Sequence, residues 1–282
     1  MLLTLQVVVP LVALSVLAYR LGPSAFRPAL AVASPLPLLA ALVLGGVAVG
    51  ANALRWRVMM DGAGLRIGRA EALAEYYRSS ALNAVLPGGV AGDALRAWRQ
   101  RTGERQGWRP GAISVLADRA AGLCLLLTVV AVVMFTEAPV LGAACAVLAV
   151  VAWSVARPSL RRLSRRQRAA VWGWSVLALA ALLGLTVVVA AAIGLSARPG
   201  AVAAVGVALL AGMAIPLNVG GWGPREAAGA FAAMLVGVPP AVGVAYAAGY
   251  GLLATVSVLP GFLILGNVVR AGRVARSAAQ VS

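Results

Sequence analysis

The stretch between Arg198 and Arg270 limits the possible folds more than any other part of the chain. It contains only two charged residues, Arg225 and Glu226, which follow a run with two prolines and three glycines from Ile215 to Pro224. Such a run cannot continue an α-helix, so it leaves backbone polar groups without helical partners. In a bilayer, protein or a wet cavity must satisfy these groups. We therefore expect a site inside the membrane; the alternative is a polar surface loop joining two short helices.

The composition predicts a polytopic membrane protein. Of the 282 residues, 62% are hydrophobic and 11% are charged, and the mean hydropathy is +0.93. All 24 basic residues are arginines, against 8 acidic residues, and they cluster in short loops. Arginines in short loops set the orientation of the spans and bind anionic lipid headgroups, which explains this pattern. Nucleic acid is therefore not an expected partner. Histidine is absent, and Cys124 and Cys145 lie in apolar segments, so no cofactor or metal site is expected.

The apolar segments predict an all-α fold with about six full membrane spans and two re-entrant, broken-helix segments. Each span is close to the ~20 residues that cross a bilayer. The expected spans are 1–19, 36–54, 111–135, 139–156, 172–193 and 241–266, and the re-entrant segments are 71–92 and 200–238. Residues 1–19 lack the basic n-region of a signal peptide, and Tyr19-Arg20 stands where a small-residue cleavage motif would be needed. This favours a retained helix over a signal peptide.

The order of these segments repeats, with three crossings in each half, so residues 139–270 form an inverted copy of residues 1–138. A tail at 271–282 follows, and both termini are expected on the cytoplasmic side of the plasma membrane. Most arginines then fall in cytoplasmic loops, and only Arg20, Arg27 and Arg198 lie outside. The cytoplasmic set is Arg55, Arg57, Arg66, Arg69, Arg96, Arg99, Arg101, Arg105, Arg109, Arg157, Arg161, Arg162, Arg165, Arg166, Arg168, Arg270, Arg273 and Arg276. The alternative topology has an external N-terminus and residues 71–86 as a full crossing. It places fewer arginines inside and more outside, and this alternative stays open.

Tryptophans near the ends of spans fit interfacial anchors. This set is Trp56, Trp108, Trp153, Trp172 and Trp174. Trp222 differs because it lies inside the second break, where we expect it to shape a pocket.

The two breaks have similar compositions. The first runs from Asn83 to Arg96, and each break combines an asparagine, a proline, a Gly-Gly pair, a further glycine and an acid–base pair. Glycine pairs can form an anion-binding concavity at helix N-termini, which suits a phosphate. The alternative is that these glycines only permit close helix packing. The expected headgroup-binding residues are Asn83, Pro87, Gly88, Gly89, Gly92, Asp93, Asn218, Gly220, Gly221, Trp222, Gly223, Arg225 and Glu226, together with Arg78, Asp118 and Arg119.

Charged residues within the apolar segments are costly unless they have partners. Arg225 offers a rigid fork of donors suited to a phosphodiester, and Glu226 could pair with it or take up a proton. The alternative is an ion pair that only fixes the loop. Adjacent helical residues point about 100° apart, so Asp118 and Arg119 should reach different partners.

The candidate partners are Arg78 for Asp118, and Asp93 or Glu226 for Arg119. The sequence Tyr76-Tyr77-Arg78 fits either headgroup contact or an ordinary snorkelling anchor.

Three motifs in order resemble the transmembrane region of lysylphosphatidylglycerol synthases. They are Asn83 to Arg96 with Leu-Pro-Gly-Gly and Gly-Asp, Asp118-Arg119 followed by Ala-Ala-Gly, and Ile215 to Glu226 with Gly-x-Arg-Glu. The resemblance implies a membrane region that moves lipids between leaflets. The chain stops at Ser282, so we expect no synthetase domain and no aminoacyl transfer. Trp222 and Pro224 depart from the family pattern.

The favoured hypothesis is a flippase for an anionic, phosphate-containing phospholipid or lipid-linked intermediate. Its movement would be passive or coupled to protons through Asp118 or Glu226. One alternative is a membrane enzyme or accessory protein acting on polyprenyl-phosphate-linked sugars, with carboxylates from Asp93, Asp118 and Glu226. Another is a non-transporting scaffold. Expected partners are membrane lipids, a second copy of the chain in a homo-oligomer, and a separate lipid-modifying enzyme.

Overall fold

The computed structural model describes residues 11–12, 14–17, 19–86, 89–100, 107–195, 198–216 and 220–266. Within this part of the chain the structure is helical and has no strand. One 3-10 helix, η1 (Pro23–Ala33), precedes a series of α-helices. They are α2 (Pro35–Gly62), α3 (Arg69–Val85), α4 (Ala91–Arg99), α6 (Arg109–Glu137), α7 (Pro139–Arg161), α8 (Arg165–Ala192), α9 (Pro199–Met213), α10 (Pro224–Leu235) and α11 (Pro240–Ser257).

Five helical segments of the described chain are long and apolar enough to cross a membrane. They are α2, α6, α7, α8 and the segment Pro240–Gly266, which contains α11. Each coincides with a predicted span, so a multi-pass membrane protein is confirmed. Most of the remaining predicted span, 1–19, lies outside the described residues, as does the tail at 271–282. The predicted count of six and the side on which each terminus lies stay predictions.

Helix α2 corrects the predicted end of the second span. The apolar run stops at Leu54, but the helix continues to Gly62. Arg55 and Trp56 were expected in an aqueous loop and at the interface, and both are buried in the protein. The Trp56 indole donates a hydrogen bond to Ser114 Oγ, 3.3 Å away on α6. Helix–helix packing therefore extends α2 beyond its hydrophobic stretch. Arg96, also expected in a loop, is buried on α4.

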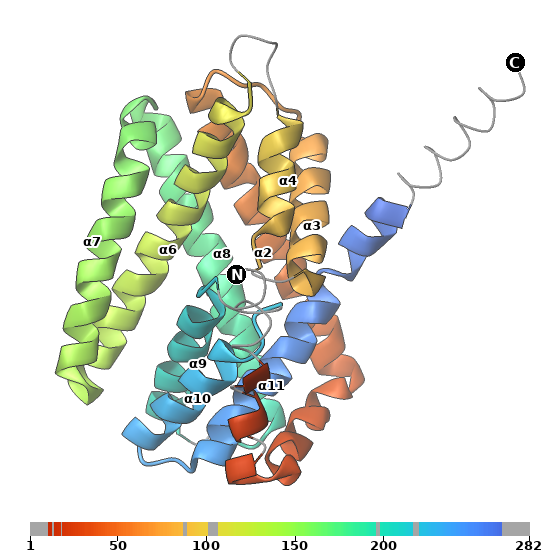
Figure 1. Cartoon of the computed structure of the whole chain (residues 1–282), viewed down its shortest axis with the longest axis vertical. Helices are drawn as coiled ribbons and strands as arrows, with labels where there is room; N and C mark the ends of the chain where they lie inside the picture. The colour runs from red at the N-terminus through yellow and green to blue at the C-terminus, as the bar shows by residue number, and fades with distance from the viewer. Residues whose placement is uncertain are drawn as a thin grey trace, which may run out of the picture.

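Two helix hairpins contain the predicted breaks. α3 packs on α4 across the break at 86–90, and α9 packs on α10 across the break at 214–223. Figure 1 shows the two hairpins in opposite halves of the molecule, each with its turn toward the middle. The breaks meet there, because a Cβ on Gly220 would collide with the carbonyl oxygen of Ala84 at the end of α3. The arrangement fits an inverted repeat, while insertion of the hairpins into a bilayer stays a prediction.

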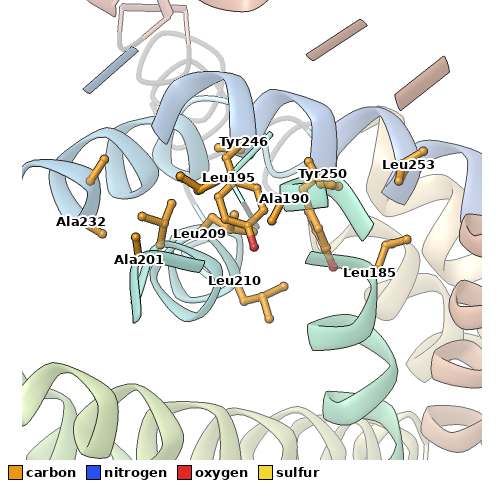
Figure 2. Close-up of a cluster of buried hydrophobic side chains, with 14 of the residues drawn as sticks. Leu185, Ala190, Leu195, Ala201, Leu209, Leu210, Ala232, Tyr246, Tyr250 and Leu253 are labelled. Atoms are coloured by element: carbon orange, nitrogen blue, oxygen red, sulfur yellow. The ribbon is translucent and has the colours of Figure 1, made fainter. Parts of the chain in front are cut away.

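The largest apolar core lies around α8, α9 and α11. Figure 2 shows Tyr246 and Tyr250 extending from α11 toward Leu209 and Leu210 of α9 and Leu185 of α8. Nearer its start, α11 also packs against α10, where Gly243 and Gly229 bring the two backbones together. A Cβ on either glycine would meet the carbonyl oxygen of the other. Small residues therefore set the distance between these helices, as is common in membrane proteins.

The glycine contact between α10 and α11 gives the first prediction. Gly243→Ala should force the helices apart and destabilise the protein by about 1–3 kcal/mol, the usual cost of overpacking. The measurement is the thermal unfolding temperature in detergent. The control is Gly173→Ala, at an exposed position of α8 where an added Cβ has no neighbour. The control should be neutral or slightly stabilising, since alanine favours a helix. Equal unfolding temperatures for the two variants would contradict the packing role of Gly243.

Candidate functional site

Five charged side chains form one row of alternating sign, and all of them except Arg119 are buried. The Arg55 Nε donates to Asp118 Oδ1 at 2.8 Å, and Arg96 Nη2 lies 3.6 Å from Asp118 Oδ2. The same Arg96 nitrogen donates to Asp93 Oδ1 at 3.0 Å, and Arg119 Nε donates to Asp93 Oδ2 at 2.7 Å. We call Arg55, Asp118, Arg96, Asp93 and Arg119 the charge row. It joins α2, α6 and α4, and an arginine stands at each end.

Arg96 is the central member of the charge row and is held between two aromatic rings. Its guanidinium carbon lies 4.5 Å from the centre of the Trp56 ring and 4.3 Å from that of Tyr76. Its Nε and Nη1 have no hydrogen-bond partner among the described residues. The ring faces compensate for part of this loss, since they attract a cation. This position was missed in the sequence because Arg96 follows a glycine-rich run and resembles a loop arginine.

Asp93 is the most connected residue of the charge row. Besides its two arginines, it accepts a hydrogen bond from Ser79 Oγ at 2.9 Å and one from Asn83 Nδ2 at 3.3 Å. Burial works to raise the pKa of the Asp93 carboxyl, but Arg119 and Arg96 hold the pKa below its ordinary value. Asp93 is therefore a carboxylate at neutral pH. Every oxygen of this carboxylate is occupied by donors.

Asn83 and Gly92 fix the start of α4. Asn83 Oδ1 accepts the Gly92 backbone N–H at 2.7 Å. A Cβ on Gly92 would collide with the backbone of Ser79, so glycine allows α4 to touch α3 here. For Gly92 and Gly220 the observed role is thus close packing. Gly89 has a positive φ of 60°. Pro87, Gly88 and Asn218 lie outside the described residues.

A cavity of about 760 Å³ opens beside the charge row, between α2, α4, α6, α8, α9 and α11. Its charged lining residues in the described chain are Arg55, Asp93 and Arg119. Arg119 faces it most openly, since 51% of that side chain is accessible although Asp93 holds it. Leucines from α6, α8 and α9 make much of the remaining wall. Val90 from the first break and Ala214 and Pro216 from the second also border this cavity.

Arg225 and Glu226 form a second, enclosed cluster. Arg225 Nη2 and Nε donate to Glu226 Oε1 at 2.6 and 2.9 Å, and Gly223 N–H donates to Glu226 Oε2 at 2.7 Å. The Arg225 guanidinium lies 4.5 Å from the centre of the Trp222 ring and packs against Gly251, where a Cβ would collide with it. Both charged side chains are fully buried. The expected pairing is present, and a role for Arg225 in headgroup binding stays a prediction.

The turn before Arg225 accommodates Pro224, one of the two departures from the expected family pattern. Gly220, Gly221 and Gly223 have positive φ angles of 59°, 85° and 94°. Pro224 then takes the first turn of α10, where its fixed φ is favourable and no helical N–H is lost.

The predicted partners of the intramembrane charges are partly wrong. Asp93 is the observed partner of Arg119, whereas Glu226 binds Arg225 and Gly223. Arg78 does not bind Asp118; its Nη1 donates to Glu75 at 2.6 Å. Glu75 also binds Arg99 at 3.1 Å, so Arg78 belongs to a separate, partly exposed cluster. Asp118 instead binds Arg55, which the sequence assigned to a loop.

Arg55 and Arg96 are the residues that sequence reasoning missed. One signal was available for each. Trp56, Met59 and Met60 continue an apolar helical pattern beyond Arg55, and Arg96 follows Asp93 at the i,i+3 spacing of a helical ion pair.

Comparison with protein families finds one matching model, described as the lysylphosphatidylglycerol synthase TM region. It matches residues 2–157 and 154–261, which together cover most of the chain. Each stretch contains one of the two helix hairpins. No curated protein and no solved structure matches the chain.

Asp118 holds two arginines inside the protein, which gives the second prediction. Asp118→Asn should leave Arg55 and Arg96 without their shared counter-charge and destabilise the fold by about 3–5 kcal/mol. Thermal unfolding in detergent measures this loss. Asp61→Asn makes the same chemical change at an exposed position near the end of α2 and should have little effect. An unfolding temperature for Asp118→Asn that equals that of the control would refute the structural role of the charge row.

Proposed function

Because the chain belongs to the family of the lysylphosphatidylglycerol synthase transmembrane region, we propose that it carries an anionic, phosphate-containing lipid between leaflets. The lipid is a phospholipid or a lipid-linked intermediate. The proposal places the protein in the plasma membrane with both termini in the cytoplasm. The observation that carries it is the position of Arg119, a half-exposed guanidinium in the wall of a large, mostly apolar cavity.

Arg119 suits a lipid phosphate better than the other arginines of the site. Arg55, Arg96 and Arg225 are almost completely enclosed, whereas Arg119 combines a fixed position with a free surface. Asp93 binds Arg119 Nε and Nη2, which orients the planar group. A guanidinium held in this way presents donors that match two phosphate oxygens.

The cavity offers the two environments that a lipid needs. Arg119 gives the cavity a charged, accessible group, and Leu123, Leu126, Leu179, Leu182 and Leu210 give it apolar walls. Both breaks border this space, so rocking of the two hairpins would expose it to each leaflet in turn. In this proposal the headgroup travels along the cavity while the hydrocarbon chains stay in apolar surroundings.

The ion pairing of the carboxylates favours transport over catalysis. Asp93, Asp118 and Glu226 each accept charged hydrogen bonds from arginines. A carboxylate whose oxygens already accept hydrogen bonds from an arginine is poorly placed to take a proton from a substrate. We therefore place transport before the enzymatic alternative.

The third prediction concerns Arg119 directly. Arg119→Gln should lower the initial rate of lipid movement at least about tenfold, because it removes one charge-assisted contact to the phosphate. The assay reconstitutes the purified protein in vesicles with fluorescent phosphatidylglycerol, and dithionite then quenches the label in the outer leaflet. Arg119→Lys should retain part of the rate, since it keeps the charge but loses the fork.

The matched control is Arg157→Gln, at an exposed position near the end of α7 and away from the cavity. It should transport like the wild-type protein. Gel filtration checks that every variant is folded. An Arg119→Gln variant that is folded and as active as the wild type would refute the proposed site.

A further inference from the structure

The charge row leaves one positive charge unbalanced at the cavity. It contains three arginines and two aspartates, and each aspartate stands between two arginines. All charged lining residues of the cavity, within the described chain, belong to this row. The opposite end of the row, Arg55, also donates to Ser175 Oγ at 3.3 Å and is buried. The row as a whole thus carries one excess positive charge beside the cavity, and Arg119 is its most exposed member there.

No carboxylate oxygen of the charge row is available to a cationic headgroup. Asp93 Oδ1 accepts from Ser79 and Arg96, and its Oδ2 accepts from Arg119 and Asn83. Asp118 is fully enclosed, and its oxygens accept from Arg55 and Tyr76. An ammonium group that entered the cavity would thus meet a guanidinium and find no counter-charge. In a low-dielectric space this repulsion is strong.

We infer that the cavity selects lipids whose headgroup carries one net negative charge and rejects headgroups that bear an ammonium group. A phosphodiester monoanion neutralises the charge row when it binds Arg119. A dianion leaves one negative charge unpaired in the cavity, and an aminoacylated phosphatidylglycerol adds ammonium groups beside the guanidinium. The inference rests on the proposed function and narrows it to unsubstituted phosphodiester lipids.

The test compares three fluorescent lipids with the same labelled acyl chains in the same vesicles. Their headgroups are phosphatidylglycerol, with charge −1, zwitterionic phosphatidylethanolamine, and lysylphosphatidylglycerol, with charge +1. The protein should move phosphatidylglycerol at least about tenfold faster than the other two lipids. A tenfold difference corresponds to ~1.4 kcal/mol of unfavourable interaction between the ammonium group and the cavity. Equal acceleration of all three lipids would overturn the inference and leave the proposed transport intact.

Asn52 offers a change of charge that leaves Arg119 in place. It lies on α2, lines the cavity and is not part of the charge row. Asn52→Asp adds a carboxylate of nearly the same shape one helical turn before Arg55, which favours its ionised form. The variant should move phosphatidylglycerol at least about threefold more slowly and move lysylphosphatidylglycerol faster than the wild type does. An unchanged headgroup preference would count against charge balance as the selector.

The control for Asn52→Asp is Gln167→Glu, the same amide-to-carboxylate change in the first turn of α8, outside the cavity. Its headgroup preference should equal that of the wild type.

A binding measurement separates failure of the inference from failure of transport. Soluble dioctanoyl forms of the three lipids are added to the protein in detergent, and the unfolding temperature is recorded. Dioctanoyl phosphatidylglycerol should raise it more than the other two lipids do, and the increase should be smaller in Arg119→Gln. If dioctanoyl phosphatidylglycerol stabilises the protein most but no lipid moves in vesicles, transport is refuted and headgroup selection is supported. No difference among the three lipids would overturn the selection.

Discussion

The structure depends on the requirement that buried charges have partners. Four charged side chains of the charge row, all but Arg119, are buried when the chain folds, and each would cost several kcal/mol if it stood alone. Alternation of sign gives every inner member two neighbours of opposite charge. The row also connects α2, α4 and α6, and through Ser79 and Ser175 it reaches α3 and α8. The same contacts that neutralise the charges therefore fix the relative positions of the helices that enclose the cavity.

The two halves of the chain use similar breaks in different ways. In the first half, Asn83, Gly92 and Asp93 fix the start of α4, and Asp93 holds an arginine from α6 that faces the cavity. In the second half, Glu226 binds its own neighbour, Arg225, which Trp222 and Gly251 enclose. The acidic residue of the first break thus holds an accessible arginine from another helix, whereas that of the second break holds its own enclosed neighbour. An inverted repeat with unequal halves can support a site whose accessible arginine is held by one half only.

The sequence predicted the helices and the breaks well because these follow from local composition. Apolar runs near the length of a bilayer marked the helices, and the proline–glycine runs marked the turns that meet at Gly220 and Ala84. Pairing of Arg119 with Asp93 was among the predicted alternatives. The burial of Arg55 and Arg96 was not predicted, because it depends on partners that are distant in sequence. Arg55 binds Asp118, and Arg96 lies between the rings of Trp56 and Tyr76. Sequence alone also could not show which arginine was enclosed and which faced the cavity.

The contact between Gly220 and Ala84 joins the two hairpins backbone to backbone, with no side chain between them. A layer of side chains could change rotamers and absorb a small displacement, but two main chains in contact cannot do so. At this point one hairpin therefore cannot move toward the other without displacing its backbone. Any residue larger than Gly220 would bring its Cβ against the Ala84 carbonyl oxygen and separate the hairpins at this contact.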